Sequence, residues 1–239
     1  MTTWIMPLSF AGRNRASDIY IIYYATYKGK TGHIGIAVDN YKIIFRENSK
    51  GGDTGPVADT VPTGELSYYD LWPNDDYFSV GRTGKDIPAV YYKLPVSTTE
   101  EITLNSLYDK GIPHKENYPT DGLLKVPTNW NQDQWVKNFL DSMVSANRDF
   151  NAQKFNCTDF VRIPLETLLD QELKCREFIL VGWSSTPNKF YRKLRKVKGV
   201  EVIKNADDKA HRSFIGQRVI YKIFHHSKKI KHIHENQTI

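Results

Sequence analysis

The segment around Cys157 constrains the fold more than any other part of the chain. Cys157 opens a run in which apolar residues recur at the spacing of one helix face: Phe160, Val161, Leu165, Leu168 and Leu169. We therefore predict a helix that starts at Cys157 and kinks, or breaks into two, at Pro164. The first turn of a helix has unpaired N–H groups and the positive end of the helix dipole, which stabilise a thiolate. Cys157 is thus a candidate nucleophile.

A nucleophilic cysteine needs a base, and the best candidate is His33. It lies in a strand-like segment in which Gly35 and Ala37 share its face, while Ile34, Ile36 and Val38 share the opposite face. The small neighbours leave room for another group to approach the imidazole. A histidine that is merely satisfied within the core is the alternative interpretation.

The first part of the chain predicts an antiparallel meander of three strands, at 18–27, 33–38 and 41–47, with His33 on the middle strand. A tight turn is expected at 39–40. The length of that turn decides which polar residue orients the imidazole. A two- or four-residue turn favours Asn48, whereas a three-residue turn brings Glu47 beside His33. Both remain candidates.

Beyond the meander, a long loop is expected over 48–64, followed by an aromatic cluster that ends at a proline. This cluster either caps an edge of the core or forms a wall of the substrate cleft. The candidate cleft residues are Tyr69, Asp70 and Trp72 from the cluster, together with Asn156 beside Cys157. Further strands are predicted at 87–94, 177–181, 200–203 and 218–224. Helices are predicted at 97–109, 132–147 and 189–198.

Composition sets limits on the class of protein. The 239 residues, 40% hydrophobic and 25% charged, suit an ordinary globular protein. We expect a catalytic domain over 1–185 and a basic C-terminal extension over 186–239 that packs on the same domain. No apolar run reaches the roughly 20 residues of a membrane-spanning helix, and the first 16 residues do not resemble a signal peptide.

The net charge of +6 is concentrated near the C-terminus, where 14 Lys and Arg stand against four acidic residues from position 186 onward. This favours an anionic polymer or a membrane surface as partner. Nucleic acid is not expected, because no aromatic stacking motif accompanies the basic residues. No cofactor or metal is expected either, and the histidines near the C-terminus are not assigned a metal. The second cysteine, Cys175, is predicted to be exposed and unpaired with Cys157.

The Gly-His-x-Gly-Ile-x-Val strand at His33 and the Asn-Cys-x-x-Phe helix start at Cys157 together resemble the circularly permuted papain-fold hydrolases. That group includes permuted relatives of the NlpC-type peptidoglycan peptidases, the lecithin retinol acyltransferase type and a branch of deubiquitinase-like peptidases. In unpermuted members the cysteine helix precedes the histidine strand, so the reversed order here carries the resemblance.

The resemblance implies an α+β, papain-like, circularly permuted fold, with an antiparallel sheet packed on helices and the nucleophile at a helix N-terminus. It implies a cysteine peptidase or amidase that acts on peptides, most of all those of peptidoglycan, in the cell envelope or outside the cell. The acyltransferase pattern has a second histidine on the next strand, which this chain lacks. A lipid acyltransferase or phospholipase, or a binding protein without catalysis, is the alternative.

Overall fold

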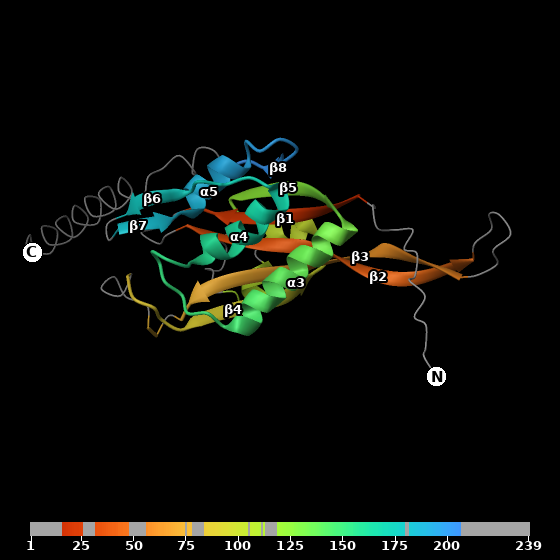
Figure 1. Cartoon of the computed structure of the whole chain (residues 1–239), viewed down its shortest axis with the longest axis horizontal. Coiled ribbons are helices and arrows are strands. Elements are labelled where there is room, and N and C mark those ends of the chain that lie inside the picture. The colour runs from red at the N-terminus through yellow and green to blue at the C-terminus, as the bar shows by residue number, and fades with distance from the viewer. Residues whose placement is uncertain are drawn as a thin grey trace, which may run out of the picture.

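The structure is a computed structural model, and it describes residues 16–25, 32–47, 56–74, 76–77, 84–104, 106–110, 112, 119–179 and 182–206. Six strands form one antiparallel sheet in the order β4-β3-β2-β1-β5-β8 (Figure 1). Their bounds are β1 (Ala16–Tyr24), β2 (His33–Glu47), β3 (Pro56–Pro73), β4 (Ala89–Val96), β5 (Gly122–Asn129) and β8 (Glu201–Lys204). A separate hairpin pairs β6 (Arg176–Ile179) with β7 (Gly182–Ser185).

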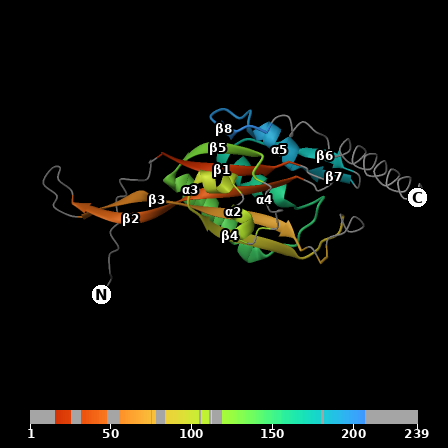
Figure 2. The same cartoon turned by 180° about the vertical axis from the view of Figure 1, so that it is seen from behind.

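Helices pack on both faces of the sheet. The long helices α3 (Trp130–Ala146) and α4 (Cys157–Leu169) lie on the face turned toward the viewer in Figure 1, whereas α2 (Ser106–Asp109) lies on the face seen in Figure 2. Successive residues of β1 point to opposite faces of the sheet. Ile19 and Ile21 pack in the core under α3 and α4. Ile22 packs in the core on the other face, with Ile102 of α1 (Thr99–Thr103). The sheet is therefore sandwiched between two apolar layers.

The prediction of an α+β fold with an antiparallel sheet packed on helices is confirmed. Most predicted elements lie within a few residues of the observed ones, although 97–109 forms two short helices in place of one. Helix α4 begins at Cys157 as predicted and continues without a break through Pro164 to Leu169. Its N-terminus is fixed by a capping box, in which the Asn156 side chain accepts from the N–H groups of the first turn.

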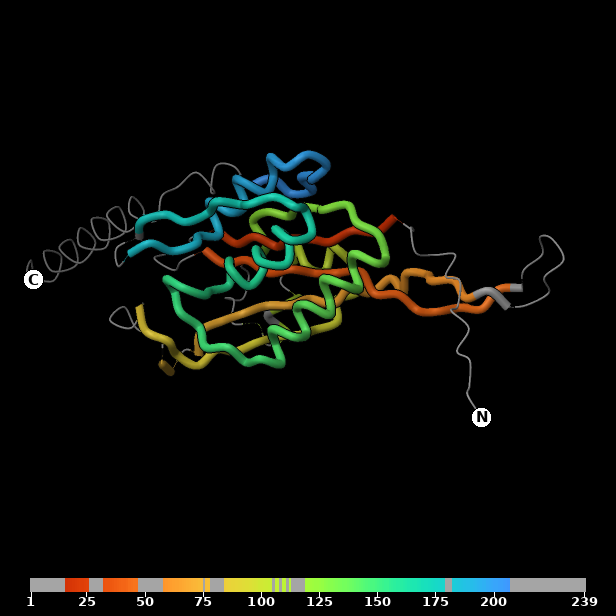
Figure 3. Tube along the Cα trace, in the orientation of Figure 1, coloured from red at the N-terminus to blue at the C-terminus, as the bar shows by residue number. Residues whose placement is uncertain are grey.

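The predicted tight turn at 39–40 is wrong. β2 continues through this point with an irregularity in register between Asp39 and Tyr41, and its partner is β3. Strand β3 starts at Pro56, within the segment that was expected to be a loop. Strands β2 and β3 continue past the residues that pair with β1 and β4, and there they form a two-stranded arm (orange in Figure 3). A bulge allows a strand to bend without ending, a possibility that turn-forming residue types alone do not reveal.

The region after residue 186 contributes to the same core as far as the structure describes it. Helix α5 (Pro187–Leu194) buries Phe190, Tyr191 and Leu194, and β8 extends the sheet beside β5. The predicted strand at 218–224 and the C-terminal histidines lie outside the described residues. Cys175 is 1% exposed, so the prediction that it lies on the surface is wrong. Both cysteines are free.

Candidate active site

The structure brings His33 and Cys157 together. His33 is the first residue of β2, and Cys157 is the first residue of α4, which packs against β2 and β3. The imidazole and the thiol form a hydrogen bond, one of the interactions that raise the pKa of His33. The His33 side chain is buried, and the Cys157 residue is 9% exposed. Two segments more than 120 positions apart in the sequence thus meet at the end of a helix.

A carboxylate completes the arrangement. Asp70 Oδ1 lies 2.5 Å from His33 Nε2, and Asp70 is fully buried. Because Nε2 bonds to the carboxylate, Nδ1 is the ring nitrogen left to face Cys157. The resulting order is thiol, imidazole and carboxylate, each side chain from a different element. This is the order of groups by which a nucleophile is activated and its base is oriented.

Three further donors hold the Asp70 carboxylate in place. Oδ2 accepts hydrogen bonds from the Tyr68 hydroxyl at 2.6 Å and the Trp72 indole at 2.9 Å, and Oδ1 accepts the backbone N–H of Leu71 at 2.8 Å. Residues 68, 70 and 72 alternate along β3 and so share one face of the strand. Burial and the nearby Asp70 raise the pKa of Tyr68 well above its usual range, so the phenol remains a donor. The buried carboxylate is fully hydrogen-bonded, as a buried charge must be.

The electrostatics around His33 favour a protonated imidazole. Burial acts to lower the pKa of His33, but the Asp70 carboxylate and the contact with Cys157 outweigh it and raise that pKa to about 10. The imidazole is therefore positively charged at neutral pH. The positively charged ring and the positive end of the α4 dipole both lie beside the Cys157 sulfur.

Gly35, which was expected to leave open space beside His33, makes room for another side chain. A Cβ added at Gly35 would lie 2.4 Å from the Tyr68 hydroxyl oxygen and 2.8 Å from two ring carbons. The space beside Gly35 is therefore filled by the Tyr68 ring and is not open to an approaching substrate. The Trp72 ring stacks on His33 with 3.9 Å between ring centroids. These two aromatic rings enclose the imidazole–carboxylate pair.

The remaining sequence candidates lie as follows. Glu47 is at the opposite end of the 15-residue strand β2 from His33, and Asn48 lies outside the described residues. Asp70 occupies the position behind the imidazole for which Glu47 and Asn48 were considered. Tyr69 points to the other face of the sheet, where its hydroxyl donates to Asp141 Oδ1 at 2.9 Å. Of the four proposed cleft residues, Asp70 and Trp72 contact His33, whereas Tyr69 does not.

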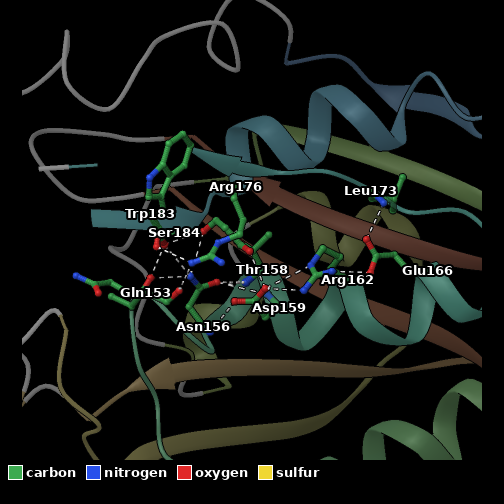
Figure 4. A network of polar contacts seen from close by, with 12 residues as sticks. Gln153, Asn156, Thr158, Asp159, Arg162, Glu166, Leu173, Arg176, Trp183 and Ser184 are labelled. Carbon is green, nitrogen blue, oxygen red and sulfur yellow. Dashed lines mark hydrogen bonds and ion pairs between the residues drawn. The ribbon is translucent and has the colours of Figure 1, made fainter. Parts of the chain in front are cut away.

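Asn156 is occupied by structural contacts. Its Oδ1 accepts from the N–H groups of Thr158 and Asp159, and its Nδ2 donates to Ser184 Oγ and to the carbonyls of Ala152 and Ser185 (Figure 4). Asn156 therefore joins the start of α4 to the β6–β7 hairpin. It positions the first turn that carries Cys157.

The role of Asp70 and its donors was not assigned from sequence. The pattern Tyr-x-Asp-x-Trp at 68–72 has the period of a strand, and three polar side chains on one face are a usable signal. The missing information was the pairing of β3 with β2, which places that face beside His33.

No family model, no curated protein and no solved structure matches this chain. Within the described residues, no group of three or more His, Cys, Asp or Glu side chains is placed to hold a metal ion. In the same residues, no helix combines the length and apolar character needed to cross a membrane.

Proposed function

We propose that the protein is a cysteine hydrolase that cleaves amide bonds through a thioester intermediate, with peptidoglycan peptides as substrate. The observation that carries the proposal is the assembly of Cys157, His33 and Asp70 in hydrogen-bonding order at the N-terminus of α4. Burying three polar groups costs desolvation free energy, which favours a chemical role for the triad over a purely structural one.

In the proposed reaction each of these three groups has one role. The Cys157 thiolate attacks the amide carbonyl carbon, and the carbonyl electrons move to oxygen to give a tetrahedral oxyanion. Collapse of this species breaks the C–N bond, and the His33 imidazolium gives its proton to the leaving amine. Neutral His33 then takes a proton from water, which attacks the thioester and releases the acid and the Cys157 thiolate. Asp70 holds the ring orientation and balances its charge throughout.

The oxyanion has a natural donor in the Cys157 backbone N–H. Asn156 caps the N–H groups of Thr158 and Asp159, and the hydrogen bonds found among the described residues include none from the N–H of Cys157 itself. A single such donor contributes about 3 kcal/mol to transition-state stabilisation in comparable sites.

The element order supports the finer proposal of a circularly permuted papain-like fold. The histidine strand β2 and the carboxylate strand β3 precede the cysteine helix α4, which packs against both strands. With peptidoglycan as substrate, the protein would act in the cell envelope or outside the cell.

The proposal is tested by incubating the purified chain with peptidoglycan fragments and measuring newly released amines and carboxylates by mass spectrometry. Cleavage by the wild-type protein, and its loss in Cys157→Ala and His33→Ala, is the expected result. Cleavage at the wild-type rate by either variant would rule the mechanism out. Activity on phospholipid esters with none on muropeptides would favour the alternative, a lipid acyltransferase or phospholipase that uses the same nucleophile.

A further inference from the structure

The β6–β7 hairpin exposes two large aromatic side chains. Phe178 is 57% exposed and Trp183 is 59% exposed. They lie directly opposite each other across the hairpin, and their rings make an edge-to-face contact with centroids 5.9 Å apart. Aromatic rings of this size are normally buried in a core or an interface, since each removes a large apolar area from water.

The hairpin is rigidly attached to the helix that carries Cys157. Ser184 and Ser185 accept hydrogen bonds from Asn156 Nδ2, and the Ser185 hydroxyl donates to Asp159 Oδ1 at 2.6 Å. Figure 4 shows the Trp183 ring pointing away from this polar network. Both serines are therefore buried and bonded within the protein, whereas the two aromatic rings are exposed.

Two cationic side chains, Arg176 and Lys189, lie at the hairpin. Arg176 precedes Phe178 by two residues on β6 and so shares its face, and its guanidinium donates to the Trp183 carbonyl at 3.0 Å. Lys189 of α5 donates to the Arg176 carbonyl at 2.7 Å. Over 176–206, eight Lys and Arg residues stand against two acidic residues, of which Glu177 pairs with Arg192 at 2.9 Å. The surface therefore combines exposed rings with a local excess of positive charge.

We propose that the β6–β7 hairpin is a docking surface for an anionic phospholipid bilayer. Aromatic rings favour the boundary between headgroups and acyl chains, and nearby Lys and Arg side chains bind anionic headgroups. The edge-to-face arrangement offers no shared flat platform for a sugar ring, and the neighbouring serines are bonded internally. These features favour a lipid surface over a wall glycan. The inference does not depend on the reaction at Cys157.

The test is sedimentation of the full chain with vesicles of phosphatidylcholine alone or mixed with phosphatidylglycerol. We expect binding to the anionic vesicles, weaker binding at high salt, and little binding to phosphatidylcholine alone. Phe178→Ser/Trp183→Ser should weaken binding to anionic vesicles by about tenfold or more, because interfacial binding scales with buried apolar area. Trp135→Ser is the matched control, since Trp135 is an exposed ring on α3, and it should bind as the wild type does.

Folding of the aromatic variants is checked by the rate at which Cys157 is alkylated. Cys157→Ala, whose folding is checked by circular dichroism, should bind vesicles normally. Three outcomes would overturn the inference. The double variant could bind as tightly as the wild type, which would assign binding to other basic residues. The control could lose as much affinity as the double variant. The wild-type chain could bind isolated peptidoglycan but neither kind of vesicle, which would make the surface a wall-binding one.

Discussion

His33 Nε2 and Asp70 Oδ1 lie 2.5 Å apart in a fully buried pair, and the two residues come from neighbouring strands of the sheet. The pair fixes which nitrogen faces the thiol and keeps the imidazole positively charged at neutral pH. Most expected properties of the site follow from this pair and from the side chains that enclose it.

The two cysteines should differ sharply in reactivity. Cys157 is at a helix N-terminus beside a positive imidazole, whereas burial raises the pKa of Cys175 to about 11. Iodoacetamide at neutral pH should alkylate Cys157 and leave Cys175 intact, as read by peptide mass spectrometry. In denaturant both should react equally. Faster labelling of Cys175 in the folded protein would contradict the assignment of the nucleophile.

Asp70→Asn should lower activity by about 10²–10⁴-fold, because the amide neither stabilises the imidazolium nor fixes the proton positions on the ring. Amide hydrolysis measures the effect. His33→Ala and His33→Ala/Asp70→Asn should then be equally inactive, because both act through one imidazole. Additive losses in the double variant would show that Asp70 acts independently of His33.

The charge on His33 also predicts a dependence of stability on pH. The folded pKa of about 10 lies above the ordinary value of 6.5. The folded state therefore binds more protons between these pH values, so this contribution to stability is complete below about 6.5 and is lost as pH rises toward 10. Urea unfolding should show this decline in the wild type. Asp70→Asn should show a flatter profile, and an unchanged slope in that variant would remove Asp70 as the cause.

Gly35→Ala should destabilise the protein by about 1–3 kcal/mol, as overpacking does, and should reduce activity. The added methyl group would meet the Tyr68 ring, which must then move away from Asp70. Tyr68→Phe is the comparison, since it removes the hydrogen bond without adding a clash. Thermal unfolding and amide hydrolysis check both variants. Wild-type behaviour of Gly35→Ala would mean that the Tyr68 ring has room to shift.

A second buried carboxylate, Asp133, should respond to acid in a predictable direction. Burial raises its pKa to about 6, although Thr128 and Tyr41 donate hydrogen bonds to it. The folded state therefore binds the extra proton between about pH 4 and 6, and the wild type loses stability from this group as pH rises through that range. Asp133→Asn should lack this component. The difference between the two urea-unfolding profiles, measured at several pH values, tests the prediction.

The sequence alone was sufficient for elements whose signal is local. The start of α4 at Cys157 and the strand that carries His33 were both predicted, because periodicity depends on neighbouring residues. Asn156 was assigned to the substrate cleft, whereas the structure shows it as the cap of α4. The antiparallel sheet packed on helices was implied by the resemblance to the permuted papain-fold hydrolases, and the structure has this arrangement. The turn at 39–40 was predicted wrongly because turn-forming residues also occur at bulges.

Only the tertiary structure decided what lies behind His33. Asp70 reaches the imidazole because β3 pairs with β2 in a register that joins Ile36 to Tyr69, and a shift of one residue would turn Asp70 to the opposite face. The contact between the Tyr68 ring and Gly35 also depends on this register. Register between strands is set by the packing of the whole sheet, so residue types along one segment identify the candidate groups but not their partners.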